Sequence, residues 1–347
     1  MSHRDSRFGL AQCAAAALGI AAGGVTAYLG AKQVLRRRRR FDLNGRTAIV
    51  TGGSRGLGLS IARELAGHGA NVVICARDER ELRAAQDELE DLGAQVLALE
   101  CDVTQQDEVA NVVHRARERF GSIDVLINNA GTISVGPASQ MRLADYHDAM
   151  DVNFEGPLMF ILEVLPEMRH RRSGRIVNIA SFGGKVPAPH MAPYCASKYA
   201  LVGLGETLRT ELCGENVFVT TVCPGLVRTG SAAYAHFKGQ HSKEKAWFEG
   251  GANAPLITTA PERLARRVVQ AMIDGDAELI TPWPAKLQVM LHGLSPTLGQ
   301  EIGAIMNRWL PGDPGTAAAR RSLTGAEVET VIDPLNAARQ ARNLPGE

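Results

Sequence analysis

Short runs of β-forming residues alternate with longer segments of helical period between residues 46 and 280, and this alternation constrains the fold more than any other feature. It is typical of βαβ units, in which a helix crosses over between two parallel strands. The runs 72–74 and 125–127 are apolar at every position, as expected of strands that helices cover on both faces. We therefore predict an α/β fold with one doubly wound parallel sheet of seven strands. The predicted strands are 46–51, 70–75, 95–100, 123–127, 175–180, 217–222 and 277–280, and the predicted helices are about 57–67, 78–92, 105–120, 141–169, 194–213 and 261–274.

Composition and charge divide the chain into four predicted segments. The net charge of +1 provides no broad field to attract nucleic acid. The six cysteines show no metal-ligand spacing, so we expect reduced cysteines and no metal site. The segments are 1–40, an N-terminal apolar stretch with an arginine run; 41–285, the α/β domain; 286–311, amphipathic helices; and 312–347, a disordered tail.

Residues 9–31 carry no charged side chain, and the five arginines Arg36–Arg40 follow them. A bilayer-spanning helix needs about 20 such residues. A signal peptide, a surface helix and an uncleaved membrane anchor are the three interpretations, and we favour the anchor because the arginines oppose export. The positive-inside rule then places residues from Phe41 onward in the cytoplasm. We predict a membrane-associated protein whose main domain faces the cytoplasm; a soluble cytoplasmic protein is the alternative, and the arginines fit membrane topology better than a nucleic-acid tether.

Two later segments depart from the strand–helix alternation. Residues 225–260, here called the lid segment, lack a clear pattern and contain Tyr234, His236, Phe237, Trp247 and Phe248. A long, poorly patterned connection inside a domain is often a lid over a site, and the aromatic residues predict an apolar pocket. Apolar residues between 287 and 309 keep helical spacing, which predicts two short amphipathic helices. Their apolar face packs on the core or a partner subunit, or contacts a membrane surface or a lipophilic substrate.

The turn after the first predicted strand reads Thr-Gly-Gly-Ser-Arg-Gly-Leu-Gly at residues 51–58. Such a turn can hold a pyrophosphate, because glycines let the backbone approach the ligand and the following helix offers free N–H groups. A tight strand-to-helix turn is the alternative, and the spacing departs from the usual GxGxxG pattern.

Three motifs in order then resemble the short-chain dehydrogenase/reductase family. They are the TGxxxGxG turn, Asn-Asn-Ala-Gly at 128–131 and the YxxxK pair Tyr194 and Lys198. The resemblance covers about residues 43–285 and is closest to the single-domain branch. It implies a Rossmann-type sheet that binds a nicotinamide dinucleotide, and it makes 41–285 the NADP-binding catalytic domain of an NAD(P)-dependent oxidoreductase.

The cofactor preference is predicted from two arginines. Dinucleotide folds that prefer NAD place an acid after the second strand, and here Ala76 stands at that position and Arg77 follows. Arg55 lies in the glycine turn. Guanidinium groups suit a 2′-phosphate, so we predict NADP(H), with NAD(H) less favoured. The alternative is that both arginines are solvated surface charges, with Asp78 available to Arg77.

The resemblance implies further cofactor contacts around the turn and the later motifs. Asp102 and Val103 resemble the adenine contact, although Asp102 could cap the next helix instead. Pro224, Gly225 and Thr229 resemble the loop at the nicotinamide carboxamide, and a plain Pro-Gly turn is the alternative. The complete predicted set is Gly52, Ser54, Arg55, Gly56, Leu57, Gly58, Arg77, Asp102, Val103, Asn129, Ala130, Gly131, Tyr194, Lys198, Pro224, Gly225, Val227 and Thr229.

Tyr194 and Lys198 stand four residues apart, so on a helix they share one face. A nearby ammonium lowers the pKa of a phenol, which would make Tyr194 a usable acid and base. By the resemblance, Ser181 hydrogen-bonds the substrate oxygen and Asn153 holds a water in the proton relay. A turn cap for Ser181 and a mid-helix asparagine for Asn153 are the alternatives.

The resemblance implies hydride transfer between nicotinamide and a carbonyl or alcohol, with Ser181 polarising the oxygen and Tyr194 exchanging the proton. We expect a lipophilic substrate from the aromatic lid segment. A non-catalytic NADP(H)-binding sensor or scaffold at the membrane is the alternative function. The family also implies a homodimer or homotetramer that associates through helices 105–120 and 141–169.

Overall fold

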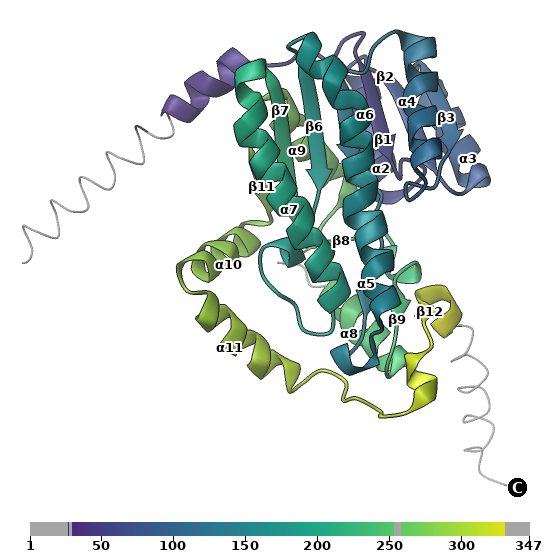
Figure 1. The fold of residues 1–347 in the computed structure, drawn as a ribbon, viewed down its shortest axis with the longest axis vertical. Helices are drawn as coiled ribbons and strands as arrows, with labels where there is room; N and C mark the ends of the chain where they lie inside the picture. Colours follow the sequence, from purple (N-terminus) through teal and green to yellow (C-terminus); the bar gives the residue numbers. More distant parts are fainter. Residues whose placement is uncertain (1–26, 28–29, 253–257, 330–347) are drawn as a thin grey trace, which may run out of the picture.

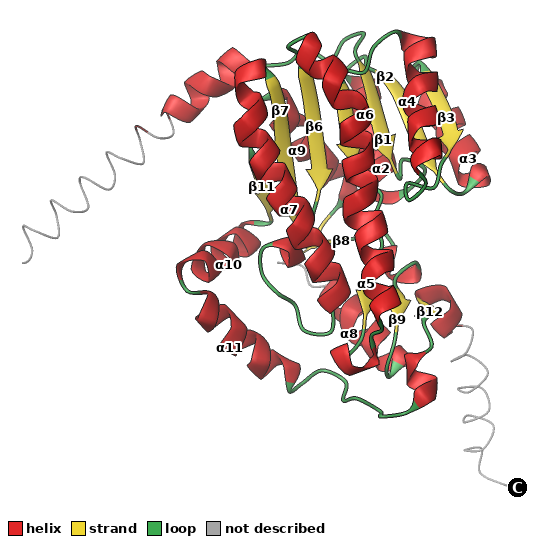
Figure 2. Ribbon diagram, in the orientation of Figure 1, coloured by secondary structure: helices red, strands yellow, loops and turns green. Residues whose placement is uncertain are grey.

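The computed structural model describes residues 27, 30–252 and 258–329. Its centre is a seven-stranded parallel sheet with the strand order β11-β7-β6-β4-β1-β2-β3 (Figures 1 and 2). The predicted Rossmann-type, doubly wound sheet is therefore confirmed, with strand bounds shifted by one or two residues. The strands are β1 (Thr47–Thr51), β2 (Asn71–Ala76), β3 (Val96–Glu100), β4 (Val125–Asn128), β6 (Gly174–Ile179), β7 (Val217–Pro224) and β11 (Glu278–Thr281).

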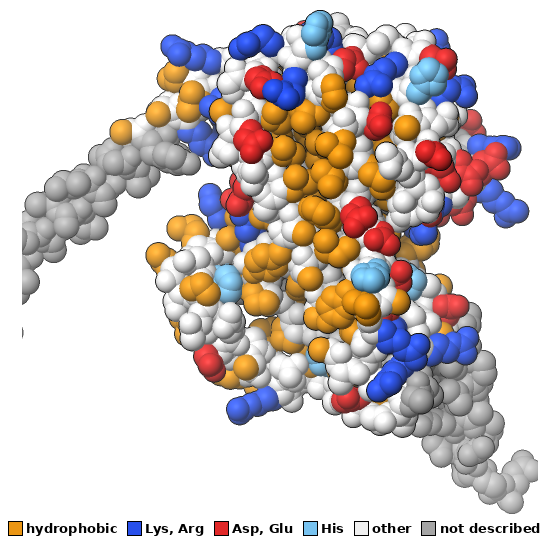
Figure 3. All heavy atoms as spheres, in the orientation of Figure 1, with side chains coloured by type: hydrophobic (Ala, Val, Ile, Leu, Met, Phe, Trp, Pro, Cys, Tyr) orange, Lys and Arg blue, Asp and Glu red, His pale blue; other side chains and the backbone are white. Residues whose placement is uncertain are grey.

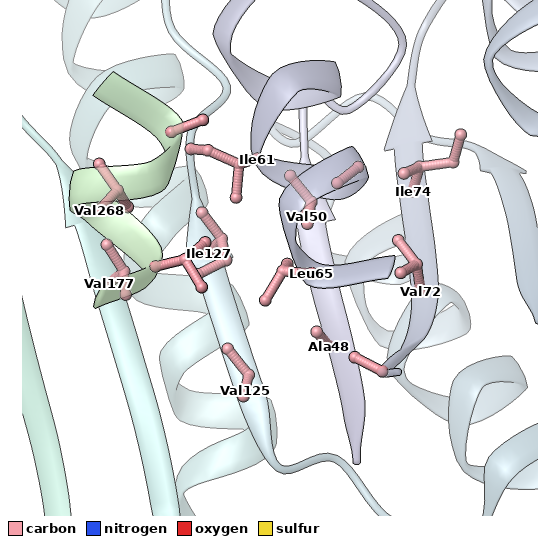
Figure 4. Close-up of a cluster of buried hydrophobic side chains, with 14 of the residues drawn as sticks. Ala48, Val50, Ile61, Leu65, Val72, Ile74, Val125, Ile127, Val177 and Val268 are labelled. Carbon is pink, nitrogen blue, oxygen red and sulfur yellow. The ribbon is translucent and has the colours of Figure 1, made fainter. Parts of the chain in front are cut away.

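Helices cover both faces of this sheet, as the uniformly apolar strands predict. On one face, α2 (Gly56–Gly67), α3 (Glu79–Asp91) and α9 (Pro261–Ile273) bury one apolar cluster against the strands. Figure 4 shows part of that cluster, where Ile61 and Leu65 of α2 pack over Val50 of β1. On the other face, α4 (Gln106–Phe120), α6 (Gly156–His170) and α7 (Ala192–Leu212) bury a second cluster.

The predicted long helix 141–169 consists of three pieces. A short helix α5 (Leu143–Met150) runs through one π-helical turn, Asp151–Glu155, into α6. Such a turn widens the backbone spacing locally and often marks a functional position. Here it carries Asn153, whose side chain is fully buried.

The lid segment is folded rather than irregular. Strand β8 (Leu226–Val227) pairs with β10 (Thr258–Thr259), and α8 (His241–Ala252) lies between them in sequence. Strand β9 (His236–Phe237) pairs with β5 (Ser134–Val135) and, on its other side, with β12 (Leu323–Thr324). Phe237 and Phe248 stack edge to face in the small apolar cluster beneath. Long-range pairing of two-residue strands organises this segment, and its sequence carries no signal for such pairing.

The predicted disorder of the tail 312–347 is wrong as far as residue 329. Strand β12 closes the small sheet of the lid segment, and Val328 is buried at 1% exposure in its apolar cluster. Asp313 accepts hydrogen bonds from Ser139 and Gln140. As far as residue 329, the tail therefore pairs with and packs against the lid segment. Residues 330–347 lie outside the described part.

Two amphipathic helices, α10 (Trp283–Leu294) and α11 (Pro296–Asn307), follow β11 as predicted. At the other end of the chain, residues 30–39 are helical, and Arg36 pairs with Asp276. No helix within the described ranges is both long and apolar enough to cross a membrane. Of the predicted anchor 9–31, only residues 27, 30 and 31 belong to those ranges, so the anchor is outside what the structure describes.

Apolar side chains also lie on the surface of α6 and α7, at the centre of Figure 3. Leu162 of α6 is 60% exposed and Tyr199 of α7 is 40% exposed. Helix α6 lies largely within the segment 141–169, one of the two segments that were predicted to join subunits. The structure contains one chain, so the homodimer or homotetramer stays a prediction.

Candidate active site

The candidate site lies at the carboxyl edge of the sheet, where the strand order reverses between β1 and β4. Crevices at such reversals are the usual binding positions of open α/β sheets. The glycine turn after β1 adopts backbone angles that other residues rarely take, with φ of +62° at Gly52 and +56° at Gly56. A Cβ atom added to Gly58 would lie 2.1 Å from the carbonyl oxygen of Gly52. The turn therefore requires its glycines. Because they have no Cβ atoms, a ligand can approach the turn backbone and the N-terminal N–H groups of α2.

A hydrogen-bond network ties the glycine turn to the end of β4. The Asn129 side chain donates to the carbonyl oxygens of Thr51 (3.0 Å) and Gly52 (3.1 Å). The Thr51 hydroxyl accepts from the backbone N–H groups of Asn129 (2.9 Å) and Ala130 (3.0 Å). The predicted contacts Asn129 and Ala130 thus lie against the turn, and Thr51 is a positioning residue that the motif analysis did not single out.

The loop after β7 reaches the same turn. A Cβ atom on Gly56 would lie 3.4 Å from the Cβ of Thr229, so Thr229 lies directly over the turn. Gly225 follows Pro224 and donates its N–H to the carbonyl oxygen of Thr281, 2.7 Å away. Val227 belongs to β8, and its carbonyl accepts from the Thr229 N–H. The predicted nicotinamide loop is therefore close to the predicted phosphate turn.

Arg55 has partners that come from distant parts of the chain. Its guanidinium pairs with Glu81 of α3 at 2.6 Å and lies 3.6 Å above the ring centre of Tyr234 from the lid segment. Ser54 also donates to Glu81 at 3.1 Å. Tyr234 was predicted to line an apolar pocket, and that prediction is wrong, because its ring packs on Arg55 instead. Leu57 packs on the first apolar cluster beside them.

The remaining residues predicted to contact the adenosine, Arg77, Asp102 and Val103, lie just after β2 and β3. Arg77 is exposed, and Asp78 caps α3 by accepting from Arg80 N and Glu81 N at 3.0 Å. Asp102 accepts from the N–H and hydroxyl of Thr104, while Gln105 is the N-cap residue of α4. Asp102 therefore stabilises the turn before that helix. Val103 is buried, and its carbonyl would lie 2.9 Å from a Cβ on Gly156.

The structure brings the four predicted catalytic residues together from three elements. Tyr194 and Lys198 lie in α7, with the Lys198 ammonium 6.0 Å from the centre of the Tyr194 ring. Ser181 lies two residues after the end of β6, and a Cβ on Gly183 would lie 3.6 Å from Ser181 Oγ and 3.3 Å from Tyr194 Cε1, so the two side chains are neighbours. Ser181 Oγ also accepts from Gly183 N, so the turn-cap alternative is realised as well. Asn153 completes the group from the π-helical turn.

Asn153 joins two segments of the site. Its Oδ1 accepts from the Thr132 N–H, and its Nδ2 donates to the Thr132 carbonyl and to Ser197 Oγ, each at 3.0 Å. A Cβ on Gly131 would lie 3.0 Å from Asn153 Oδ1 and 3.5 Å from Lys198 Nζ. The predicted contact Gly131 therefore keeps open the space between Asn153 and Lys198.

Burial controls the charges at the site. It raises the pKa of Tyr194 to about 12, and the hydrogen bond from Ser181 opposes that rise only in part. Burial also lowers the pKa of Lys198 to about 8, with the Cys223 thiol opposing. The Lys198 ammonium donates to the Ile179 carbonyl at 2.9 Å. Desolvation of the phenol is the largest cause of the rise in the Tyr194 pKa. The predicted lowering of the Tyr194 pKa depends on the Lys198 ammonium together with a nicotinamide cation in the oxidised complex, so it stays a prediction.

A second buried polar group connects α8 of the lid segment to His190, which lies shortly before Tyr194 in the chain. Glu244 of α8 is fully buried; it lies 3.0 Å from His190 Nδ1 and accepts from Trp247 Nε1 at 2.7 Å. The His190 carbonyl accepts from Gly136 N at 2.7 Å. His190 precedes Tyr194 by four residues, but its partner lies 54 positions away, so no local pattern could reveal this contact. Across the described ranges, no group of histidine, cysteine or acidic residues could hold a metal ion.

The fold and the glycine turn at its sheet edge are typical of enzymes that bind a dinucleotide. The family model for short chain dehydrogenase matches residues 46–237. This chain therefore belongs to the short-chain dehydrogenase family, and it is an oxidoreductase that acts on C=O or CH–OH groups. The predicted family resemblance is confirmed.

Several individual proteins are similar to this chain. A putative ketoacyl reductase 1 of granaticin polyketide synthase from Streptomyces violaceoruber is 36% identical over 240 residues, which are 67% of this chain and 88% of that protein. An 11-beta-hydroxysteroid dehydrogenase A from Sesamum indicum is 31% identical over 278 residues, 79% of this chain and 78% of that protein. Among solved structures, a single-residue variant of actinorhodin polyketide ketoreductase with NADPH superposes with a TM-score of 0.61 at 35% identity, covering 68% of this chain and 95% of that one.

The buried Lys198 predicts a specific pH dependence of stability. With a pKa of about 8 in the folded protein against an ordinary 10.5, the folded state binds fewer protons than the unfolded state between these values. Burial therefore costs stability below pH 8, and the cost fades as the pH rises from about 8 to about 10.5. Between pH 7 and pH 10, the wild type should gain about 2 to 3 kcal/mol of unfolding free energy relative to Lys198→Met.

Urea unfolding of both proteins at the two pH values measures this difference. The variant Lys243→Met, at an exposed lysine of the lid segment, is the control, and it should follow the wild type. Parallel pH profiles for wild type and Lys198→Met would show that the Lys198 ammonium is not desolvated.

Proposed function

We propose that the protein is an NADP(H)-dependent oxidoreductase that interconverts a lipophilic carbonyl compound and its alcohol, with Tyr194 as acid and base. The observation that carries this proposal is the grouping of Ser181, Tyr194 and Lys198 at the carboxyl edge of the sheet. A Cβ on Gly183 would lie within 3.6 Å of both Ser181 Oγ and Tyr194 Cε1, and Lys198 Nζ lies 6.0 Å from the Tyr194 ring centre. A non-catalytic fold needs none of these side chains in this arrangement.

The residues present fit a nicotinamide dinucleotide. The glycine turn leaves the space that a Cβ on Gly58 would fill, and α2 presents its N-terminal N–H groups there, which suits a pyrophosphate. Thr229 would contact the nicotinamide end of the molecule and Lys198 its ribose. When bound, the cofactor supplies or accepts the hydride.

The chain itself orients the substrate and moves the proton. Ser181 Oγ and the Tyr194 phenol donate hydrogen bonds to the carbonyl oxygen, which polarises the carbonyl toward reduction. Tyr194 then gives its proton to the developing alkoxide; it holds that proton at neutral pH because burial keeps its pKa near 12. Lys198 stabilises the resulting phenolate, and Asn153 holds Thr132 and Ser197 so that α7 keeps its position against the strand edge.

Replacing Tyr194 by phenylalanine tests the catalytic role. The variant removes only the hydroxyl, so we expect tight NADPH binding to remain while turnover falls by about 10²-fold or more, the usual scale of a lost proton donor. Oxidation of NADPH is followed against carbonyl compounds graded from small and polar to large and lipophilic. If Tyr194→Phe turns over at the wild-type rate, Tyr194 is not the acid. Tight NADPH binding without turnover on any compound by the wild type would favour the sensor or scaffold alternative.

The preference for NADP(H) is supported by two arginines. Arg55 and Arg77 stand at the adenosine end, and Ala76 occupies the position of the NAD-selective acid. Glu81 pairs with one edge of the Arg55 guanidinium, and the Tyr234 ring covers one face. The other N–H groups of the guanidinium can then donate to a phosphate. The similar actinorhodin ketoreductase has a structure with NADPH.

Replacing both arginines tests this preference. We expect Arg55→Ala/Arg77→Ala to weaken NADPH binding by about 10²- to 10⁴-fold, since each charge-assisted hydrogen bond contributes roughly 1.5–3 kcal/mol, and to leave NADH binding nearly unchanged. Fluorescence titration with each cofactor measures both constants. Equal losses for NADPH and NADH would remove the two arginines from 2′-phosphate recognition.

A lipophilic substrate is supported by the surroundings of Tyr194. Its ring belongs to an apolar cluster with Ile133, Ala188, Leu226 and Trp247. Polar substrates would leave their own groups without partners against such a wall. One similar protein is an 11-beta-hydroxysteroid dehydrogenase by name, and a steroid is largely apolar.

Membrane association through residues 9–31 belongs to the same proposal. The uncharged stretch and the arginines after it support an anchor with the catalytic domain on the cytoplasmic side. Alkaline carbonate washing of membranes from expressing cells should leave the full-length protein in the pellet. Complete release into the wash would contradict the anchor and favour the soluble alternative.

A further inference from the structure

The helices α10 and α11 expose an unusual number of large apolar side chains. Trp283 is 74% exposed, Leu294 is 83% exposed and Trp309, two residues beyond α11, is 82% exposed. In Figure 3, apolar side chains are visible over α10 at the left of the molecule. The full set of exposed residues is Trp283, Leu287, Met290, Leu291, Leu294, Leu298, Ile302, Ile305, Met306 and Trp309, here called the hairpin face.

The hairpin face is not part of the hydrophobic core. Ala285 is the single buried residue of α10, and α11 has none. The two helices pack mainly on each other and on β11, and Figure 1 shows them at the edge of the molecule, away from both helical layers. Contiguous exposed apolar surface of this kind marks a site of interaction with another apolar phase or partner.

The polar residues around the hairpin face suit a lipid surface. Charged side chains from Trp283 to Trp309 are confined to Lys286, Glu301 and Arg308. Tryptophan at both ends is typical of helices at the headgroup level of a bilayer. Between Trp283 and Trp309 the two cations Lys286 and Arg308 outnumber the one carboxylate, Glu301. Positive charge beside apolar surface favours an anionic bilayer.

We propose that the hairpin face lies in the surface of an anionic lipid bilayer, with Trp283 and Trp309 at headgroup depth. The contact depends neither on the predicted anchor 9–31 nor on the proposed reaction. It bears on substrate access all the same, because α10 begins directly after β11 at the carboxyl edge of the sheet. There the Thr281 carbonyl accepts from Gly225 N of the predicted nicotinamide loop. A carbonyl compound dissolved in the bilayer would then enter from the side on which the site lies.

The tryptophans of the chain provide a direct test. The protein has three, Trp247, Trp283 and Trp309, and Trp247 packs inside the lid segment against Phe248. The full-length protein is mixed with vesicles of phosphatidylcholine and phosphatidylglycerol whose acyl chains carry bromine, a short-range quencher of tryptophan fluorescence. We expect quenching of the wild type and loss of that quenching in Trp283→Phe/Trp309→Phe, which retains only Trp247.

This readout separates the hairpin face from the anchor, because residues 9–31 can bring the chain to a vesicle without bringing Trp283 and Trp309 into it. Leu294→Glu/Ile302→Glu should reduce the quenching, whereas Leu92→Glu, at another exposed leucine just after α3, should not. Absence of quenching in the wild type, or equal quenching in the double-tryptophan variant, overturns the proposal. If light scattering then shows a dimer that Leu294→Glu/Ile302→Glu dissociates, the hairpin face belongs to a second copy of the chain.

Discussion

The parallel pairing of β1 with β4 is the constraint on which the site depends. These two strands pair in register from Ala48 with Val125 to Val50 with Ile127, so both end at the same height. After β1 the chain enters α2 on one face of the sheet, and after β4 it passes through β5 and α5 to α6 on the other face. The turn after β1 and the Asn129 segment after β4 then meet, and Thr51 and Asn129 satisfy the polar groups of both turns. The two turns therefore meet at the N-terminus of α2, whose N-cap residue Arg55 makes no side-chain capping bond.

Chemistry at this edge depends on charges that the protein keeps away from water. Tyr194 and Lys198 are both buried, and burial favours the uncharged form of each. A phenol that holds its proton is suited to donate it during reduction. A lysine with a pKa near 8 can gain or lose its charge near neutral pH, so a bound cofactor or a phenolate can determine its state. The cost of burying Lys198 is thus linked to the catalytic arrangement, with the Ile179 carbonyl as its compensating partner.

The C-terminal half of the chain surrounds this edge. The lid segment is held by the buried Glu244 with its partners His190 and Trp247, and the strand β12 of the tail adds to its small sheet. Tyr234 joins the same segment to Arg55 of the glycine turn. The lid segment therefore contacts both the predicted cofactor turn and the segment before Tyr194, and a change in the tail at Val328 would act on it through their common apolar cluster.

The sequence by itself determined the features that depend on near neighbours. Uniformly apolar runs and helical periods predicted the doubly wound sheet, because strands covered on both faces and amphipathic helices leave local patterns. The glycine turn and the spacing of Tyr194 and Lys198 predicted the cofactor turn and the catalytic pair for the same reason. Tertiary structure alone decided the features that join distant residues. Glu81 and Tyr234 lie 153 positions apart yet both hold Arg55, and β12 has only two residues, too few to leave a pattern. The direction of the Tyr194 pKa shift also lay beyond the sequence, since it depends on how much of the folded chain excludes water from the phenol.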